Sequence, residues 1–211
     1  AAVQSSDIEQ LHETNPLRDG LSESNPQRFR VERPKSSFAS WYQFFPRSEG
    51  AYYGEDGKIV PGNLKTSIAG LERAAAEGFN IVYLPPIFPI GVTNRKGRNN
   101  SLVAGPNDPG SPFGIGSELG GHDTVDPQLG TMDDFKAFCE RAHELGLEIA
   151  LDFALQCSPD HPWVKAHPNW FRTKPDGTIA FAENPPKKYQ DIYPIDFNAD
   201  MEGIEKEVER I

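Results

Sequence analysis

Two aspartates occupy positions in the sequence where a carboxylate is not expected without a reason. Asp152 lies within the apolar run 147–154, where a buried carboxylate is costly unless it is paired or used in chemistry. Asp123 lies in the polar, glycine-containing run 120–131. Each also has a simpler explanation, namely a hydrogen-bonded buried aspartate for Asp152 and a turn former for Asp123.

Aromatic residues gather in segments that we expect to be loops or loop edges. They are Trp41, Tyr42, Tyr52, Tyr53, Trp163, Trp170, Phe171, Tyr189 and Tyr193. Flat aromatic faces stack on sugar rings, and carboxylates and amides bind sugar hydroxyls, although ordinary packing explains any single aromatic residue equally well. Carbohydrate binding is therefore one hypothesis for these residues.

Nucleotide and metal sites are not indicated. The glycines in 114–121 give Gly-x-Gly-x-x-x-Gly-Gly, which misses the dinucleotide-binding pattern by one position, and no Walker sequence is present. Cys157 and His161 are four positions apart, but no second pair completes a set of metal ligands. We expect neither a metal nor a cofactor.

The elements that would position these groups alternate between strand and helix. The runs 38–45, 79–84 and 147–154 predict three strands. Apolar residues spaced three or four apart predict a helix between each pair of strands. The first helix carries Leu64, Ile68, Leu71 and Ala75, and the second carries Met132, Phe135, Phe138, Ala142 and Leu145. Thr131 and Asp134 resemble a capping box at the start of the second helix.

This order predicts a parallel sheet covered by helices. An open doubly wound sheet and a (β/α) barrel both fit it. The connections 45–64 and 84–131 that follow strands are long, whereas the turns from helix to strand are short, which favours a barrel with its chemistry at the C-terminal face. We therefore predict an α/β fold, specifically an incomplete TIM (β/α)8 barrel of about three β/α units with long loops on that face.

The domain organisation follows from the same patterns. Residues 1–35 are polar and contain three prolines, so we expect a lead-in or linker segment with a short helix near residues 8–12. Residues 36–211 would form the N-terminal portion of a catalytic barrel. Because three strands cannot close an eight-stranded barrel and 200–211 looks like the start of a further helix, we expect a larger protein.

The charge and composition exclude several classes of function. The 211-residue chain has 21 Lys and Arg against 31 Asp and Glu, a net charge of −10, which argues against binding to nucleic acids or anionic membranes. Its two cysteines make no disulfide framework. The most apolar stretch, 81–92, is interrupted by prolines and is shorter than the roughly 20 residues that span a bilayer. We expect no signal peptide and a cytoplasmic location.

Two segments resemble the α-amylase superfamily. Residues 122–131 are similar to the segment before the second barrel helix, and 151–161 lies where that superfamily has its first conserved region. Gln156 and Cys157 replace the usual Asn-His, and His122 stands where a sugar-stacking Tyr is usual.

In these departures from the usual pattern, the sequence resembles one subgroup, the bacterial α-1,4-glucan:maltose-1-phosphate maltosyltransferases (GlgE-type). The similarity runs from about Val31 to Asn198. The stretches that carry it are Trp41-Tyr-Gln-Phe-Phe-Pro-Arg-Ser48, Pro85-Pro-Ile-Phe-Pro-Ile-Gly91, Asn94-Arg-Lys-Gly-Arg-Asn99 and Phe153-Ala-Leu-Gln-Cys-Ser-Pro-Asp-His-Pro-Trp163.

The resemblance implies roles for individual residues. The residues implied to bind the donor sugar are Lys96, Gln156 and Asp191. Those implied to hold the donor phosphate are Asn184, Lys187 and Tyr189. Those implied to shape the site are Asp123, Asp152 and His122, and Asp152 is not the nucleophile.

The resemblance also implies the reaction. A retaining transfer moves maltosyl units from α-maltose 1-phosphate to α-1,4-glucans in glycogen synthesis, with an Asp nucleophile and a Glu acid. We expect both groups beyond Ile211, so the chain by itself would catalyse nothing, and we expect a homodimer for the full-length protein. An α-amylase-family hydrolase or isomerase and a non-enzymatic glucan-binding protein remain alternatives.

Overall fold

The computed structural model describes residues 6–16, 20, 22 and 24–211, and the chain divides into two units, residues 1–37 and 38–211. The first unit contains helices α1 (Ser6–Thr14) and α2 (Pro34–Ser37), neither of which buries a residue. The helix expected near residues 8–12 lies within α1. The assignment of residues 1–35 as a lead-in stays a prediction, and residues 1–5, 17–19, 21 and 23 lie outside the described part.

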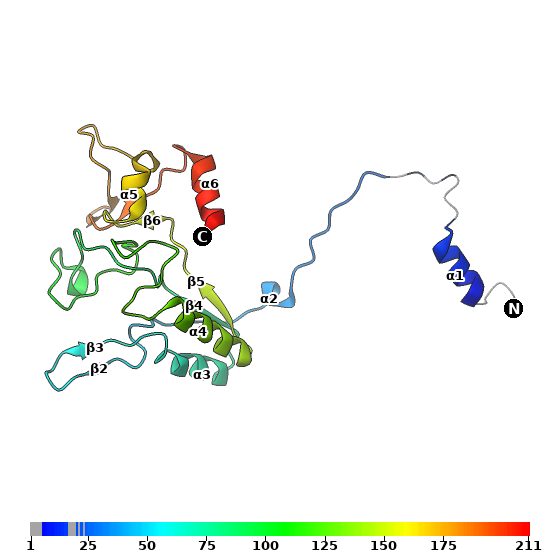
Figure 1. The fold of residues 1–211 in the computed structure, drawn as a ribbon, viewed down its shortest axis with the longest axis horizontal. Coiled ribbons are helices and arrows are strands. Elements are labelled where there is room, and N and C mark those ends of the chain that lie inside the picture. Colours follow the sequence, from blue (N-terminus) through cyan, green and yellow to red (C-terminus); the bar gives the residue numbers. More distant parts are fainter. Residues whose placement is uncertain (1–5, 17–19, 21, 23) are drawn as a thin grey trace. The chain divides into compact units, whose positions relative to one another are not determined.

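A parallel three-stranded sheet is the centre of the second unit (Figure 1). It consists of β1 (Trp41–Gln43), β4 (Ile81–Leu84) and β5 (Glu148–Leu151), in the order β1-β4-β5. Each strand falls inside a segment that the sequence predicted to be a strand, and each is shorter than that segment. Pro85 and Pro86 end β4, because proline has no N–H to donate to a neighbouring strand.

Two helices connect these strands and pack against each other. Helix α3 (Ile68–Ala76) follows β1, and helix α4 (Met132–Glu144) follows β4. Arg141 of α4 forms an ion pair with Glu72 of α3 at 3.0 Å. Because the strand order is sequential and the two helices touch, both helices cover the same face of the sheet (Figure 1). An open sheet whose strand order reverses would place them on opposite faces.

The capping box predicted before α4 is confirmed. Thr131 Oγ1 accepts a hydrogen bond from Asp134 N at 3.1 Å, and Asp134 Oδ2 accepts one from Thr131 N at 2.9 Å. These bonds satisfy two backbone N–H groups that have no partner within the helix. At the other end of α4, Gly146 has φ 76°, a conformation that glycine adopts without steric cost. The start and end of α4 are thus encoded locally.

The main hydrophobic core lies between the sheet and these two helices. Its members come from both helices, all three strands and the loops between them; buried among them are Phe44, Leu71, Ala74, Val82, Leu84, Phe138, Ala142 and Leu147. The rings of Phe44 and Phe138 meet edge to face, with centroids 6.5 Å apart. Leu64, which the sequence assigned to the first helix, is buried in the turn before α3.

The segments outside this layer are short and irregular. An antiparallel pair, β2 (Tyr52–Tyr53) with β3 (Ile59–Val60), follows β1, and the 3-10 helix η2 (Arg98–Asn100) lies in the long loop after β4. A second group follows β5 (Figure 1). It comprises β6 (Gln156–Cys157), α5 (Pro162–Ala166), η3 (Pro168–Trp170), β7 (Ala182–Asn184), β8 (Lys187–Tyr189), β9 (Tyr193–Pro194) and α6 (Met201–Arg210).

The second group has its own small core. It contains Cys157, Trp163, Trp170, Phe171, Ile195 and Ile204. Two hydrogen bonds join α6 to this core, from Trp163 Nε1 to Glu207 and from Trp170 Nε1 to Asp200, each at 3.0 Å. The helix expected over residues 200–211 is observed as α6, with Asp200 as its N-cap.

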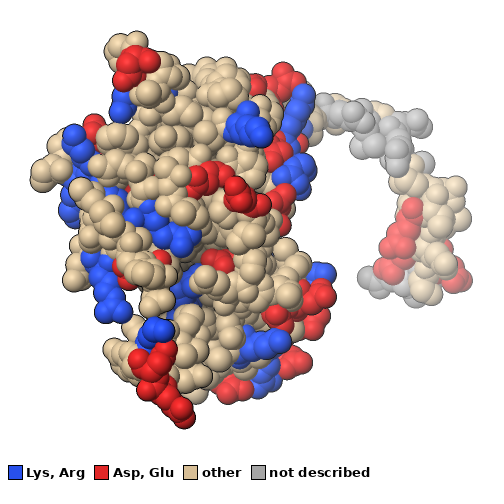
Figure 2. Space-filling model, turned by 60° about the vertical axis from the view of Figure 1, so that its left-hand side comes forward, with Lys and Arg blue, Asp and Glu red and all other residues tan. Residues whose placement is uncertain are grey.

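Charged side chains of both signs are distributed over the visible surface (Figure 2). No helix in the described part of the chain is long and apolar enough to cross a membrane.

The core between α4 and the sheet should dominate the stability of this unit. We expect Phe138→Ala to lower the free energy of unfolding by about 3–5 kcal/mol, since a buried ring is lost and a cavity remains. Met132→Ala on the same helix is the matched control, because Met132 is 45% exposed, and its cost should stay below about 1 kcal/mol. Denaturant unfolding followed by circular dichroism measures both. Equal effects of the two substitutions would contradict this description of the core.

Candidate functional site

Asp152 lies at the C-terminal end of β5 and is already paired. Its backbone N–H donates to Leu84 O at 2.9 Å, which continues the pairing of β5 with β4. Its carboxylate accepts a hydrogen bond from the Tyr83 hydroxyl of β4. This bond to Asp152, together with burial, raises the pKa of Tyr83 to about 12. The contact fixes the carboxylate at the edge of the sheet where the long loops begin.

His122 and His161 are both buried and form a directed chain of hydrogen bonds. Trp163 N donates to His161 Nδ1 at 3.0 Å, so the proton of His161 is on Nε2. His161 Nε2 then donates to His122 Nδ1 at 3.1 Å, and His122 Nε2 donates to Ala154 O at 2.8 Å. Every ring nitrogen has a partner only when both imidazoles are neutral.

Burial and this hydrogen-bond arrangement disfavour the charged form of both histidines. Burial, followed by the proximity of His122, lowers the pKa of His161 to about 3. Burial also lowers the pKa of His122. The His122 ring stacks on the Trp163 ring with centroids 4.6 Å apart and an angle of 12° between the planes. His122 is therefore a packed, neutral group that joins the loop 120–131 to α5.

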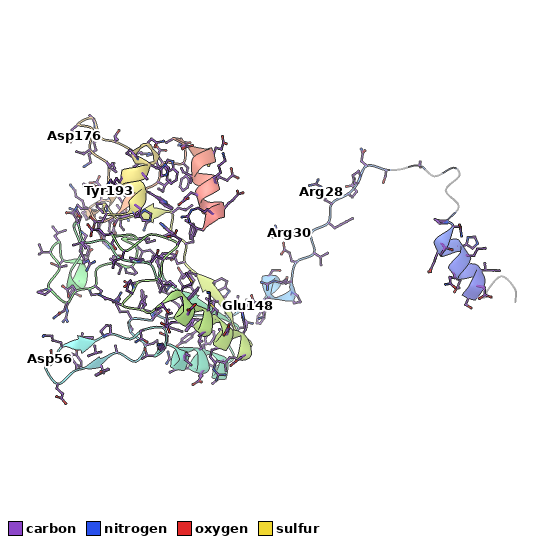
Figure 3. The ribbon with its side chains drawn as sticks, viewed as in Figure 1. Arg28, Arg30, Asp56, Glu148, Asp176 and Tyr193 are labelled. Carbon is purple, nitrogen blue, oxygen red and sulfur yellow. The ribbon has the colours of Figure 1, made fainter. Side chains whose placement is uncertain are left out.

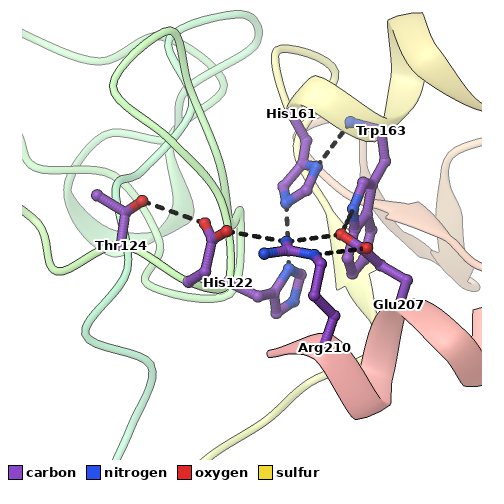
Figure 4. A network of polar contacts seen from close by, with 7 residues as sticks. His122, Thr124, His161, Trp163, Glu207 and Arg210 are labelled. Carbon is purple, nitrogen blue, oxygen red and sulfur yellow. Dashed lines mark hydrogen bonds and ion pairs between the residues drawn. The ribbon is translucent and has the colours of Figure 1, made fainter.

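Asp123, the neighbour of His122, is paired with α6. Figure 4 shows Arg210 reaching from α6 toward Glu207 and the loop that carries His122. Arg210 Nη2 lies 2.8 Å from Asp123 Oδ2, and Arg210 Nε lies 2.8 Å from Glu207 Oε2. The bonds from Arg210 lower the pKa of Asp123 and lower that of Glu207 to about 2. Both carboxylates are therefore ionised and engaged at neutral pH.

Lys96 and Asp191 are buried close to each other. The Lys96 ammonium donates to Lys188 O at 3.2 Å and to Gln190 Oε1 at 3.0 Å. Asp191 Oδ1 is buried and has no hydrogen-bond partner within the described residues. Burial raises the pKa of Asp191, while the positive charge of Lys96 opposes that shift. A buried carboxylate oxygen without a partner is unusual, and it is available to accept a hydrogen bond from a ligand.

Gln156 reaches the same region from β6. Its Nε2 donates to Phe113 O at 3.4 Å, and the next residue, Gly114, lies against Asp191. The pairing of Gln156 with Pro194 places β6 beside the strand that begins two residues after Asp191. Gln156 and Asp191 therefore both lie against the loop residues 113–114, and the charge of Lys96 acts on Asp191.

The three residues expected to hold phosphate share one face of the β7–β8 hairpin. Asn184 pairs directly with Lys187, and Ala182 pairs with Tyr189. Side chains of directly paired residues point to the same side of a sheet, and residues two apart on a strand do likewise. Asn184, Lys187 and Tyr189 therefore lie on one face.

The opposite face of this hairpin carries a different pair. Glu183 and Lys188 pair directly and form an ion pair at 3.8 Å. Lys187, in contrast, makes no ion pair within the described part of the chain. The hairpin leads straight into Gln190, whose Oε1 accepts a hydrogen bond from Lys96, so the hairpin and the Lys96 contact are adjacent along the chain.

The nine expected residues thus fall into separate places. One place holds Lys96, Gln156 and Asp191, with the hairpin residues Asn184, Lys187 and Tyr189 adjoining in sequence. Another holds His122 and Asp123, tied to α5 and α6. Asp152 is at the end of β5 with Tyr83. Among the described residues, no hydrogen bond or ion pair runs directly between the residues of one place and those of another.

Sequence reasoning missed several residues that organise these places. Asp160, Glu207 and Arg210 received no role, and His161 was considered only as a metal ligand. Their partners are far away in the sequence, 67 and 68 residues for Asp160 and 87 for Arg210 with Asp123. No spacing rule covers such distances; only the charge of the residues was visible.

Two solved structures with similar folds are α-amylases. An α-amylase from Lactobacillus plantarum is 33% identical with a TM-score of 0.57, and the match covers 76% of this chain and 32% of that chain. A maltogenic α-amylase from Thermotoga neapolitana is 28% identical with a TM-score of 0.58, covering 81% and 35%. The fold is thus α/β and matches part of an α-amylase structure; within the described residues the sheet does not close into a barrel.

Curated relatives define the family more narrowly, although no protein-family model matches the chain. The α-1,4-glucan:maltose-1-phosphate maltosyltransferase of Bifidobacterium longum is 84% identical over the whole chain, which covers 28% of that protein. The enzymes of the same name from Arcanobacterium haemolyticum and Mycolicibacterium smegmatis are 55% and 57% identical over 100% and 93% of the chain, which covers 31% and 28% of their lengths. Nearly the whole chain is thus similar to proteins of this name, and it spans less than a third of the length of these relatives. The resemblance inferred from the sequence motifs is confirmed, and the roles of single residues stay predictions.

The two buried histidines should make the protein less stable in mild acid. A group whose pKa is lowered by folding binds protons more readily when unfolded, so stability is lost as the pH falls below about 6.5, the ordinary value for histidine. For His161 we expect a loss of about 2 kcal/mol between pH 7 and pH 5. Denaturant unfolding at several pH values measures it.

His161→Asn keeps an acceptor for Trp163 N but does not titrate, so the dependence on pH should become shallower. His143→Asn, at an exposed position of α4, is the matched control and should leave the dependence unchanged. An unchanged slope in His161→Asn would contradict the neutral hydrogen-bond chain.

Proposed function

We propose that this chain is the N-terminal part of the catalytic barrel of a retaining maltosyltransferase. The enzyme would move maltosyl units from α-maltose 1-phosphate to the non-reducing ends of α-1,4-glucans and release phosphate. The observation that carries the proposal is the 84% identity, over the whole chain, with the Bifidobacterium longum enzyme of that name. The sequential parallel sheet with both helices on one face supports the barrel, since a barrel continues in this way around its axis.

The donor sugar would bind where Lys96, Gln156 and Asp191 converge. The unpartnered Oδ1 of Asp191 would accept a hydrogen bond from a sugar hydroxyl and so lose its desolvation cost. The Lys96 ammonium has three donors, of which two are in use, and it would supply the third to a hydroxyl oxygen. The carbonyl oxygen of the Gln156 amide is a further acceptor.

The donor phosphate would lie against the face of the β7–β8 hairpin. An ammonium, an amide and a phenol supply hydrogen-bond donors to a dianion, and the lysine also compensates its charge. The register of the hairpin, which places Asn184, Lys187 and Tyr189 on one side, supports this role. Glu183, the nearest carboxylate on the hairpin, is on the other side with Lys188, where it would repel the phosphate least.

The chemistry itself would use two carboxyl groups that we expect outside this chain. An aspartate attacks the anomeric carbon as the bond to the phosphate oxygen breaks, and phosphate leaves with a proton from a glutamic acid. The 4-hydroxyl of the glucan then attacks the maltosyl-enzyme, and the glutamate takes the proton of that hydroxyl. His122, Asp123 and Asp152 would shape the site through their contacts with Trp163, Arg210 and Tyr83. The chain alone would transfer nothing.

The homodimer and the cytoplasmic location belong to the same proposal. The homodimer rests on the family resemblance alone, whereas the cytoplasmic location rests on the expectation from the sequence. Analytical ultracentrifugation of the full-length protein tests the first of them.

The experiment that tests the reaction is phosphate release by the full-length protein. The protein is mixed with α-maltose 1-phosphate and a short maltooligosaccharide, and both phosphate and the glucan products are measured. Release of phosphate together with growth of the glucan by two sugars supports the proposal. Reducing sugar formed from the glucan without phosphate release would favour an α-amylase-type hydrolase, for which the two solved α-amylases are the precedent. Glucan binding without either product would favour a non-enzymatic glucan-binding protein.

Within the β7–β8 hairpin, the effect of replacing a lysine on KM for the donor should depend on the face of the hairpin that carries it. We expect Lys187→Ala to raise KM for α-maltose 1-phosphate about tenfold or more, because one charge-assisted contact with the phosphate is lost. Lys188→Ala is a closely matched control: it is the adjacent residue, it points to the opposite face, and its backbone contact with Lys96 is retained. Steady-state kinetics with varied donor compares the two variants. A larger effect of Lys188→Ala would refute the assignment of the phosphate to the Lys187 face.

A further inference from the structure

Asp160 holds a turn that lies about 67 residues earlier in the sequence. Its Oδ2 accepts hydrogen bonds from Val92 N at 2.6 Å and Thr93 N at 2.7 Å. Its Oδ1 accepts a third bond from Thr93 Oγ1 at 2.6 Å. All three distances are short, as is typical of hydrogen bonds to an ionised carboxylate. One carboxylate thus binds both the backbone and the side chain of this turn.

Electrostatics favour the ionised form of Asp160. Burial by itself would raise the pKa of Asp160, but the bonds from Thr93 and Val92 and the nearby positive charge of Arg95 lower it below its ordinary value. The carboxylate is therefore a full negative charge at neutral pH, and it would be costly to leave its three donors without an acceptor.

The turn is held in place from both sides. Arg95 Nε donates to Gly91 O at 2.7 Å, and Arg95 Nη2 donates to Ile90 O at 2.8 Å, which close the turn on itself. Gly91 lies directly against Ser158, and a Cβ at Gly91 would overlap that side chain. Ser158 Oγ in turn donates to Gly116 O at 2.6 Å and accepts from Asp160 N at 3.0 Å. The segment 158–160 therefore joins the loops 91–95 and 114–116.

The position of this turn bears on the proposed donor site. Lys96 follows Arg95 directly, and its side chain reaches Gln190 and the backbone of Lys188. Asp191 lines a narrow crevice together with Gly91, Thr93 and Ser158, and this crevice has no room for a water molecule. The contact made by Asp160 is thus adjacent to Asp191, and Thr93 precedes Lys96 by three residues.

We propose that Asp160 is a positioning residue for donor binding: by holding Val92 and Thr93 against the segment 158–160, it sets where the Lys96 ammonium lies beside Asp191. This inference rests on the proposed function. Asp160 acts through Lys96 and touches no reacting atom.

The kinetic test uses the full-length protein and a pair of substitutions at Asp160. We expect Asp160→Ala to raise KM for α-maltose 1-phosphate about tenfold with kcat changed less than about threefold, since uniform binding of donor is lost. Asp160→Asn should restore most of the affinity, because its carbonyl oxygen can accept both backbone bonds and its amide can donate to Thr93 Oγ1. A loss of kcat at unchanged KM would overturn the proposal.

Asp176 provides the matched control. Its Oδ1 accepts bonds from Thr178 N at 3.0 Å and from Thr178 Oγ1 at 2.7 Å, a similar contact at an exposed loop (Figure 3). Asp176→Ala should leave both KM and kcat unchanged. If it raises KM as much as Asp160→Ala, the role of Asp160 is general loop stability, and the proposal is wrong.

A double substitution separates positioning from stability. If Asp160 acts through Lys96, then Lys96→Ala with Asp160→Ala should raise KM no further than Lys96→Ala alone. If KM of the double variant rises by the product of the two single effects, the proposal is overturned. If Asp160→Ala fails to fold, Thr93→Val replaces it in the test, because this substitution removes one of the three bonds at nearly constant volume. Thr93→Val should raise KM less than Asp160→Ala would. In a protein that already carries Lys96→Ala, it should raise KM no further.

A crystal structure of Thr93→Val or Asp160→Asn keeps this inference distinguishable from the proposed function. If the wild-type protein releases no phosphate, the proposed function fails. The crystal structure of the variant still shows whether Asp160 determines the position of Lys96. Displacement of Lys96 Nζ from Gln190 Oε1 in Thr93→Val, and its retention in Asp160→Asn, support the positioning role. An unmoved Lys96 in Thr93→Val overturns it.

Discussion

The parallel pairing of β1, β4 and β5 is the constraint on which the rest of the structure depends. Parallel strands deliver their following loops to the same edge of the sheet, so the segments after residues 43, 84 and 151 must share space there. These loops are long and contain little regular structure, and hydrogen bonds within each loop satisfy only part of their polar groups. They are held by hydrogen bonds between residues far apart in sequence, such as Asp160 with Thr93 and His122 with Ala154.

These long-range contacts divide the polar groups into two kinds. Both ring nitrogens of His122 and both carboxylate oxygens of Asp123 have hydrogen-bond partners, and Asp152 is paired with Tyr83 through one of its oxygens. Asp191 keeps a buried oxygen without a partner among the described residues, and the Lys187 ammonium makes no ion pair there. Capacity that the protein leaves unused at a buried position is available to a ligand. The presence or absence of a partner within the protein, more than residue type, distinguishes the groups proposed to bind the donor from those proposed to support them.

The framework was predictable because its signals are local. Apolar residues three and four apart placed α3 and α4, and Thr131 with Asp134 placed the start of α4 within one residue. Short β6 to β9 were not predicted, because two- or three-residue strands carry no periodicity and exist only through pairing. Leu64 was assigned to a helix on spacing alone, yet it is buried in the preceding turn, since the pattern records burial and not backbone conformation.

By itself, the sequence determined the alternation of strands and helices and the resemblance to the maltosyltransferases, because both depend on residues that are close together along the chain. The tertiary structure decided which polar groups are in use and which are free. Asp123, Asp160 and Asp191 are the same residue type in similar loops, but one faces Arg210, one binds Thr93 and one keeps an unpartnered oxygen. Their partners lie in segments that only the folded sheet brings together, and no local rule specifies which carboxylate meets which donor.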